Sequence, residues 1–307
     1  MPSLQKEIDQ LRRQKKAVIL SHTYQPPEIQ DIADIVGDSY GLSLQATKVE
    51  ADLIVFCGVS FMAETAAILN PRRRVLLPDA SAGCPMAEMI TASQLRDLKS
   101  QHPGAAVVCY VNSTAEVKAE SSICCTSSNA VKIVESIPPE QPIIFVPDRY
   151  LGRFVERRTN RQLIVWDGFC PTHAMLEIDT VLGMKRQYPE AELMVHPECM
   201  PEVQDAADHV LSTGQMCELV KTTECRRFLV GTEEGIIYTL RQIAPHIDYI
   251  SLSPQLVCPN MKKTTLAKVL HSLQTGEPRV TVPTEVADRA RQAITAMLEV
   301  TEGRSFK

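Results

Sequence analysis

The sequence contains 10 cysteines but has no Cys-x-x-Cys pair. Structural zinc sites take four protein ligands, often from such close pairs. Cys217 and Cys225 are eight residues apart and are therefore poor candidates for a zinc site. The sequence also lacks any apolar run that approaches the ~18–20 residues of a membrane-spanning helix. These absences speak against a zinc finger and against an integral membrane protein.

An excess of positive charge is missing as well, because 37 acidic residues outnumber 32 basic ones and give a net charge of −5. The short basic clusters at 72–74, 157–158 and 226–227 fit a solvated surface better than a nucleic-acid face. Residues 3–8 have the charged amphipathic pattern of a helix, not the pattern of a signal peptide. We therefore expect a cytoplasmic protein with neither nucleic-acid nor membrane partners.

In a reducing cytoplasm, disulfides are disfavoured and most cysteines act as small buried hydrophobic residues. This interpretation suits the cysteines in or beside apolar runs, which are Cys57, Cys109, Cys124, Cys125 and Cys225. The hydrophobic fraction of 44% and the charged fraction of 22% are typical of a soluble globular protein. The length of 307 residues leaves room for two or three domains of ~100–200 residues each.

Cys84, Cys170 and Cys258 differ from the other seven cysteines because each is followed by proline. The intervals between them are 86 and 88 residues, and a glutamine follows each after 17, 17 and 16 residues. We interpret this periodicity as three copies of one unit, each ending in one cysteine. The expected units are residues 1–86, 87–172 and 173–261, with the C-terminal segment 262–307 packed on the first unit.

Short apolar runs alternate with helical patterns along the chain, which is typical of parallel sheets covered by helices on both faces. We therefore expect an α/β protein built from three similar αβα units, each with a parallel sheet, around a pseudo-threefold axis. Strands are expected at 17–21, 51–57, 75–77, 105–110, 122–125, 143–146, 163–166, 192–195, 210–211, 228–230, 249–252 and 280–282. Helices are expected at 3–15, 28–36, 40–49, 89–101, 130–136, 174–187, 215–220, 234–243, 263–273 and 284–300. Ser39 is the expected cap of the helix at 40–49.

Polar side chains follow the first expected strand of each unit at matching positions. They are His22 and Tyr24, Tyr110 and Asn112, and His196 and Glu198, with intervals of 88 and 86 residues between the leading residues. The second strands are followed by Gly58 and Ser60, by Ser127 and by Thr213. Functional loops of parallel sheets lie at the carboxyl ends of the strands. Around a pseudo-threefold axis, these loops and the three cysteines would converge on one cavity.

Three converging thiolates suit a [4Fe–4S] cluster in which one iron has no protein ligand. Such clusters usually take four cysteines, and an iron that lacks one can act as a Lewis acid, as an open zinc site does. Two alternatives remain open on spacing alone. The Cys-Pro steps could be loop turns with buried thiols, or the thiols could bind zinc.

Several motifs, in order from about residue 17 to residue 263, together resemble the quinolinate synthase family. They are Ser21–Tyr24, Gly37–Ser39, Ala82–Ala87, Tyr110–Asn112, Thr126–Asn129, Gly168–His173, His196–Cys199 and Cys258–Met261. The resemblance implies three similar αβα domains around a central [4Fe–4S] cluster held by Cys84, Cys170 and Cys258. Longer members carry a further cysteine where this sequence has Gln255, so a local disulfide switch at Cys258 is not expected.

The resemblance also implies an activity. Quinolinate synthases condense iminosuccinate (iminoaspartate) with dihydroxyacetone phosphate to form quinolinate, and they release phosphate and two waters in de novo NAD synthesis. The small-molecule substrates and the cluster are thus the implied partners and cofactor. A functional link to an aspartate oxidase or dehydrogenase, as the source of the unstable imine, follows from the same resemblance.

The residues suit that chemistry. Tyr24 is the candidate for proton transfer on the triose, provided that the iron or His22 lowers its pKa from the ordinary ~10. Glu198 is the better base for the later steps, with His196 as its neighbour and as a donor to a substrate carboxylate. The same four residues, Tyr24, His22, Glu198 and His196, could instead hydrogen-bond only the loop backbone.

Substrate binding is expected at helix starts and at neutral donors. Ser127 and Thr213 begin expected helices, where free N–H groups favour anions, although simple capping explains these residues as well. Ser39 is a candidate for the triose phosphate or the imine, and His173 for orienting the loop of Cys170 or moving protons. The expected binding set is His22, Ser39, Tyr110, Val111, Asn112, Ser127, His173, His196, Pro197, Glu198 and Thr213.

Two other classes of function remain compatible with the cysteine pattern. An iron–sulfur hydro-lyase would remove water from a hydroxydiacid and would need no phosphate subsite. A non-enzymatic iron–sulfur redox sensor would not need the converging histidine, tyrosine and glutamate side chains.

Overall fold

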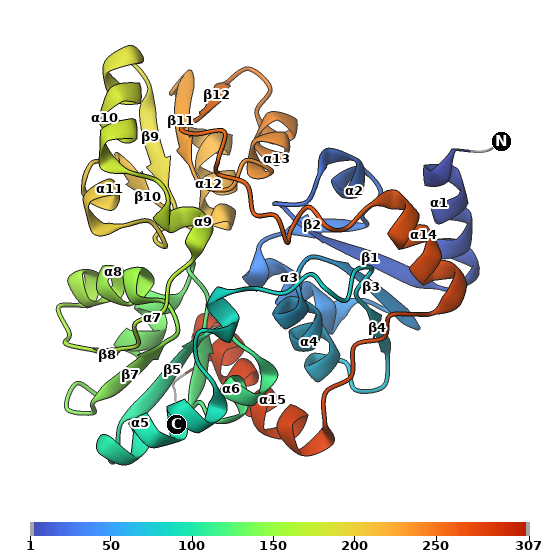
Figure 1. Ribbon diagram of the computed structural model, residues 1–307, viewed down its shortest axis with the longest axis horizontal. Helices are drawn as coiled ribbons and strands as arrows, with labels where there is room; N and C mark the ends of the chain where they lie inside the picture. The colour runs from blue at the N-terminus through green and yellow to red at the C-terminus, as the bar shows by residue number, and fades with distance from the viewer. Residues whose placement is uncertain (1–2, 305–307) are drawn as a thin grey trace.

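The computed structural model describes residues 3–304. It contains three four-stranded parallel sheets, which lie around a common centre (Figure 1). The first has the order β2-β1-β3-β4, from β1 (Ala17–His22), β2 (Ile35–Gly37), β3 (Leu53–Cys57) and β4 (Arg74–Leu76). The second has the order β6-β5-β7-β8, from β5 (Ala106–Tyr110), β6 (Ile123–Cys125), β7 (Ile143–Val146) and β8 (Ile164–Val165). The third has the order β10-β9-β11-β12, from β9 (Glu192–Val195), β10 (His209–Val210), β11 (Arg227–Gly231) and β12 (Asp248–Ser251).

Helices connect the parallel strands, as crossovers of this kind require. The first unit contains α1 (Leu4–Gln14), α2 (Pro27–Asp31), α3 (Ser39–Lys48) and α4 (Ser60–Leu69). The second contains α5 (Ala92–Gln101), α6 (Ala115–Ala119), α7 (Ala130–Glu135) and α8 (Arg149–Thr159). The third contains α9 (Pro171–Ala174), α10 (Ile178–Gln187), α11 (Pro201–Asp205), α12 (Thr213–Thr222) and α13 (Ile236–Ile243). The identical strand order in the three sheets confirms the expected α/β class and its three similar units.

The repeat extends to individual hydrogen bonds. In each unit the first strand donates a backbone amide to a side chain that lies 15 residues further along the chain. The pairs are Ile19 with Asp34 at 2.8 Å, Val107 with Ser122 at 3.0 Å and Leu193 with Asp208 at 2.7 Å. Each bonded side chain lies directly before the short edge strand of its unit. The same local hydrogen bond therefore positions that strand in all three sheets.

The units share one core. The largest hydrophobic cluster contains buried residues from all three sheets, among them Leu20, Val108 and Val230. Side chains on both faces of the central strands are buried, which explains why those strands read as continuous apolar runs. The three sheets are therefore held together by a common apolar interior in addition to the chain itself.

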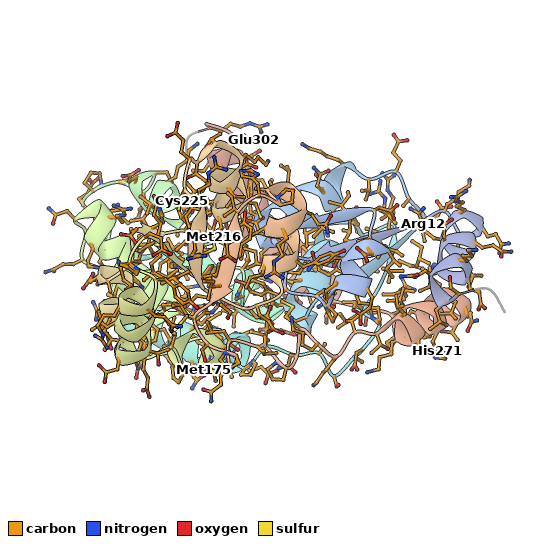
Figure 2. All side chains as sticks on the ribbon, turned by 90° about the horizontal axis from the view of Figure 1, so that it is seen from above. Arg12, Met175, Met216, Cys225, His271 and Glu302 are labelled. Carbon is orange, nitrogen blue, oxygen red and sulfur yellow. The ribbon has the colours of Figure 1, made fainter. Side chains whose placement is uncertain are left out.

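The C-terminal segment divides between two units. Helix α14 (Leu266–Thr275) packs against α1 and β3 of the first unit, and Figure 2 shows α14 beside α1 at the outer end of that unit. Helix α15 (Thr284–Thr301) lies mainly against α6 and β6 of the second unit and touches α4 less. The expectation that 262–307 packs on the first unit is therefore wrong for α15. Its apolar face, which includes Ile294 and Met297, completes the core of the second unit.

Other elements also differ from the expectations. Residues 35–37 form the edge strand β2, although the sequence indicated a helix through Val36, because the strand is too short to show alternation. The polar stretch 149–159 was not among the expected helices, but it forms α8, whose many arginines hid its buried face. Residues 280–282 form no strand; the structure has an isolated antiparallel bridge from Leu76 to Arg279 instead.

The cap of α3 also differs from the expectation. Asp38, not Ser39, is its N-cap, and the Asp38 carboxylate accepts from the amide of Gly41 at 2.7 Å. The division of the chain at residues 86, 172 and 261 stays a prediction, and residues 1–2 and 305–307 lie outside the described residues. Within residues 3–304, no helix combines the length and the apolar character that crossing a membrane requires.

Candidate active site

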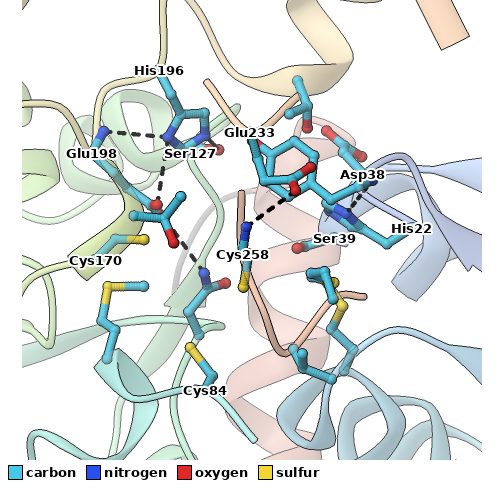
Figure 3. A pocket seen from close by; sticks show the side chains of 18 of the residues that line it. His22, Asp38, Ser39, Cys84, Ser127, Cys170, His196, Glu198, Glu233 and Cys258 are labelled. Atoms are coloured by element: carbon cyan, nitrogen blue, oxygen red, sulfur yellow. Dashed lines mark hydrogen bonds and ion pairs between the residues drawn. The ribbon is translucent and has the colours of Figure 1, made fainter. Parts of the chain in front are cut away.

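A cavity lies where the three units meet, at the carboxyl ends of their strands (Figure 3). Cys84, Cys170 and Cys258 line the cavity, one from each unit, and none of the other seven cysteines does. The structure thus brings together the three cysteines that the spacing singled out.

Each of the three cysteines lies in a loop whose backbone amides point back at its sulfur. Burial raises the pKa of Cys84 to about 12, while the amides of Met86 and Ala87 oppose that shift. Burial likewise raises the pKa of Cys170 and of Cys258, and in both the amide three residues further on opposes it. Amide donors of this kind stabilise thiolate sulfur and are a usual feature around iron–sulfur clusters. The donor set, three inward thiols with matching amides, therefore fits a cluster with three protein ligands.

The loop after β1 carries His22 and Tyr24. The Nδ1 atom of His22 accepts from the Tyr24 amide at 3.1 Å, which leaves Nε2 for the cavity. Burial lowers the pKa of His22 to about 3, so the ring is neutral near pH 7. Burial also raises the pKa of Tyr24 well above its ordinary value. The expectation that His22 lowers the Tyr24 pKa is therefore wrong, because His22 contacts the Tyr24 backbone and not its hydroxyl.

The loop after β9 carries His196 and Glu198 in the same arrangement. The Glu198 amide donates to Nδ1 of His196 at 3.3 Å, and burial lowers the pKa of His196 to about 3. Burial works against ionisation of Glu198, but its interactions with His196 and His173 and the hydrogen bonds from His173 and Tyr110 lower its pKa to about 2. Glu198 is therefore a buried carboxylate that stays ionised near neutral pH.

The second unit supplies donors to this carboxylate. The Tyr110 hydroxyl donates to Oε1 of Glu198 at 2.6 Å, and the Asn112 side-chain amide reaches the same oxygen at 3.4 Å. His173 lies 2.8 Å from the other oxygen through Nδ1, and that nitrogen is 3.2 Å from the sulfur of Cys170. Ligand atoms of Cys170, His173 and Glu198 all lie within 4.8 Å of one another. The acid–base groups thus adjoin one of the cysteine thiols.

A hydrogen-bonded chain links the first and third units through Thr232. Its hydroxyl lies 2.6 Å from the Tyr24 hydroxyl and 2.8 Å from Nε2 of His173. Because His173 contacts Glu198, the chain runs from Tyr24 to Glu198 through two side chains. Thr232 was not among the expected site residues. It follows β11, the third strand of its unit, whereas the repeat-related polar residues follow first and second strands.

Comparisons with known proteins agree with this geometry. The family described as Quinolinate synthetase A protein matches residues 6–299. A protein of Dehalococcoides mccartyi (strain CBDB1), named quinolinate synthase, is 53% identical over 294 residues, covering 96% of this chain and 97% of the relative. The chain belongs to the quinolinate synthetase A family. Quinolinate synthases of Geotalea uraniireducens (strain Rf4) and Methanoregula boonei are 52% and 54% identical, with 96% of this chain covered in each case and 96% and 97% of the relatives.

Within this member of the quinolinate synthetase A family, three hydroxyls occupy equivalent positions after the edge strands β2, β6 and β10. They are Ser39, Ser127 and Thr213, at intervals of 88 and 86 residues, and all three line the cavity. The alignment of Ser127 and Thr213 with Gly58 and Ser60 is therefore wrong, because β2 was mistaken for helix. Thr213 begins α12, whereas Ser127 precedes α7 by three residues and lies 3.2 Å from Nε2 of His196 through its hydroxyl.

Further polar or aromatic residues of the family member line the cavity without having been expected. Asp38, Tyr40 and Glu233 are among them. Asp38 and Glu233 carry raised pKa values because they are buried, and Glu233 pairs with Lys262 at 2.8 Å. No spacing rule pointed to them, since none follows a first strand.

Two expected binding residues do not present side chains to this cavity. Val111 is buried in the core, where its amide donates to Cys125 at 2.9 Å. The carbonyl of Pro197 accepts from Gln204 at 2.9 Å. Any contact from either residue to a ligand would have to come from the backbone.

Proposed function

We propose that this chain is a quinolinate synthase, which condenses iminosuccinate with dihydroxyacetone phosphate to give quinolinate, phosphate and two waters. One observation carries the proposal: three cysteine loops, an ionised carboxylate and a protonated tyrosine, contributed by different units, face one cavity. Membership of the family supports it further, because the relatives bear that name. Such a cavity suits two small substrates that must meet.

The proposed cofactor is a [4Fe–4S] cluster held by Cys84, Cys170 and Cys258. When bound, it would supply a Lewis-acidic iron that has no protein ligand. The amides that point at the three sulfurs would stabilise the thiolate form of the ligands. Around them, Val59, Phe61 and Met62 give the cavity an apolar wall that limits access of water.

The substrate carboxylates would be bound by donors at the edge-strand loops. Ser127 and His196 already contact each other at 3.2 Å, so their outward donors can share one carboxylate. Thr213 lies at the first turn of the ten-residue helix α12, where free amides favour anions. Ser39 is the equivalent residue of the first unit, and we assign it to the triose phosphate or the imine.

Proton transfers are assigned to Tyr24 and Glu198. With its raised pKa, Tyr24 is a proton donor at neutral pH, while Glu198, with a lowered pKa, is available as a base. Thr232 and His173 connect the two groups, so a proton taken up at Glu198 can return through Tyr24. His22, neutral and with Nε2 free of the loop backbone, adds a donor or acceptor beside Tyr24.

The proposal includes a place in metabolism. The product is a precursor in de novo NAD synthesis, and the imine would come from an aspartate oxidase or an aspartate dehydrogenase. We place the enzyme in the cytoplasm, where both substrates and a reduced cluster are available.

Anaerobic purification followed by a turnover assay tests the function. With both substrates, the cluster-loaded protein should form quinolinate and phosphate in equal amounts, and leaving out the triose phosphate should abolish both. Air should destroy the cluster and the activity with little loss of fold. A loaded protein that forms no quinolinate would overturn the proposal. Turnover of a hydroxydiacid alone would instead support a hydro-lyase, and no turnover at all would support a sensor.

A further inference from the structure

Three buried side chains occupy one equivalent position in the three units. Gln30, Lys118 and Gln204 lie on the short helices α2, α6 and α11, at intervals of 88 and 86 residues. Their exposed fractions are 6%, 0% and 4%. A buried polar side chain normally has hydrogen-bond partners, and in each case at least one partner lies across a boundary between units.

Gln30 joins the first unit to the third. Its Nε2 donates to the carbonyls of Thr23 and Gln25, both at 2.9 Å, and to that of Gly235 at 3.2 Å. Its Oε1 accepts from the Thr239 hydroxyl at 2.7 Å. The first two bonds fix the loop of His22 and Tyr24, and the last two attach that loop to α13.

Lys118 joins the second unit to the first, and its side-chain hydrogen bonds go to the neighbouring unit. Its ammonium donates to the Phe61 carbonyl at 3.2 Å and to the Thr65 hydroxyl at 2.9 Å. Phe61 and Thr65, on α4, lie 174 residues before Gly235 and Thr239, the partners of Gln30 on α13. The contacts of Lys118 with α4 are therefore equivalent to the contacts of Gln30 with α13.

Gln204 joins the third unit to the second. Its Nε2 donates to the carbonyls of Pro197 and Cys199 at 2.9 and 2.7 Å, as Gln30 does in its own loop. Its Oε1 accepts from Arg157 of α8 at 2.5 Å. The loop of His196 and Glu198 is thus attached to a helix of the neighbouring unit.

The three helices that these side chains contact in the neighbouring units, α4, α8 and α13, each hold a cysteine loop. The amides of Ser60, Arg149 and Glu234, at the starts of α4, α8 and α13, donate to the carbonyls of Ala82, Gly168 and Leu256 at 2.8, 2.8 and 2.9 Å. Each accepting carbonyl lies two residues before Cys84, Cys170 or Cys258. Hydrogen bonds therefore connect Gln30, Lys118 and Gln204, each through one helix, to a cysteine loop of the neighbouring unit.

We propose that Gln30, Lys118 and Gln204 are positioning residues that couple their own unit to a cysteine loop of the neighbouring unit, and that Gln30 and Gln204 do so through the strand-end loops whose carbonyls they bind. The coupling fixes the positions of the acid–base groups and the three thiols relative to one another, although these groups belong to three units. This inference rests on the proposed cluster but is separate from it, since none of the three side chains lines the cavity. Supporting residues of this kind commonly change metal affinity by about 10- to 100-fold when they are removed.

Lys118 is the most informative residue to change, because glutamine occupies the equivalent position in both other units. Lys118→Met keeps the length of the side chain and removes its hydrogen bonds. Lys118→Gln restores a donor, and its oxygen could accept from Thr65 as Gln30 accepts from Thr239. The exposed Lys48→Met is the matched control. The measurement is the rate at which anaerobic holoprotein loses iron to a chelator, together with the thermal midpoint.

We expect Lys118→Met to lose iron about tenfold faster than the wild type or more, and Lys118→Gln to recover most of that loss. Wild-type rates in Lys118→Met, or a Lys118→Gln variant as labile as Lys118→Met, would overturn the inference. If Lys118→Met fails to fold, Thr65→Val removes the same bond from the other side and should speed iron loss. An unchanged rate in Thr65→Val would then overturn it.

The proposed function can fail separately. A wild-type protein that holds no cluster would refute the cofactor, and the coupling with it. A wild-type protein that holds the cluster and forms quinolinate, while Lys118→Met matches it in iron loss, would refute only the coupling.

Discussion

The loops that follow β1 and β9 have the same backbone arrangement but different chemistry. In each, a histidine Nδ1 accepts from the amide two residues later, at 3.1 Å for His22 and 3.3 Å for His196. In each, a buried glutamine binds two loop carbonyls. The residue whose amide is held is Tyr24 in the first unit and Glu198 in the third. One scaffold therefore presents two unlike acid–base groups to one cavity.

The environments push the pKa values of these two residues in opposite directions. Burial raises the pKa of Tyr24, while for Glu198 the effects of His196, His173 and Tyr110 outweigh burial and lower the pKa. Pairs of titratable groups whose pKa values are pushed apart commonly divide the roles of acid and base. The repeat therefore fixes the position of the titratable group, whereas the side chains around it decide its chemistry.

The largest effect is expected from removing the base of the third unit. Glu198→Gln keeps the shape and can still accept from Tyr110, but it cannot take a proton. We expect kcat to fall roughly 10²- to 10⁴-fold with iron and sulfide content retained. The exposed Glu202→Gln in the same unit is the control. A variant with nearly normal turnover would remove Glu198 from the chemistry.

The matching change in the first unit is Tyr24→Phe, which keeps the packing and removes the hydroxyl. We expect a catalytic loss of roughly 10²-fold or more, with an intact cluster and retained binding of a diacid. Steady-state kinetics and diacid titration would measure these properties. Nearly normal turnover would leave the acid–base work to His22, His196 or Glu198.

A smaller effect is expected from breaking the link between the two loops. Thr232→Val keeps the volume and removes the hydroxyl between Tyr24 and His173. The loss of hydrogen bonding in this chain should lower kcat about tenfold, corresponding to about 1.4 kcal/mol, with little change in KM. Thr264→Val is a matched control, since the Thr264 hydroxyl is equally buried and has no partner. Equal kinetics in the two variants would show that the link does not serve the reaction.

A further effect concerns stability and pH rather than catalysis, and it should be alike in the two loops. Burial lowers the pKa of His22 and of His196 to about 3, so between pH 6.5 and 3 the unfolded chain binds a proton that the folded chain does not. Stability is therefore lost as the pH falls through this window, by about 1.4 kcal/mol per pH unit for each histidine. His22→Asn and His196→Asn should each reduce the slope by that amount. The exposed His271→Asn should leave it unchanged.

Denaturant unfolding of cluster-free protein at several pH values would measure these slopes. Equal slopes in the wild type and in both variants would contradict neutral buried histidines. A change in only one of the two variants would break the equivalence of the loops.

How far the sequence predicted this site depends on the strand involved. The first strands are largely apolar, so His22, Tyr110 and His196 could be aligned by their intervals, as could the three Cys-Pro steps. The edge strand β2 has three residues, and its misassignment to a helix moved Ser39 out of register with Ser127. Alternation cannot be recognised over so short a segment.

Contacts between units could not be predicted from one sequence. Thr232 follows a third strand, and only folding places its hydroxyl beside Tyr24, which is 208 residues away. The upward shift of the Tyr24 pKa depends on burial, which the sequence does not show. The C-terminal helix α15 was assigned to the first unit because its apolar face gives no information about which partner it covers.

The proposed cluster depends most directly on the three cysteines, because the repeat places one of them in each unit beside the cavity. Iron and sulfide analysis of anaerobically purified Cys84→Ala, Cys170→Ala, Cys258→Ala and Cys57→Ala variants tests it in one measurement. We expect loss of the cluster in the first three and full cluster content in Cys57→Ala, whose thiol is buried away from the cavity. Full content in Cys170→Ala, or loss in Cys57→Ala, would contradict the account.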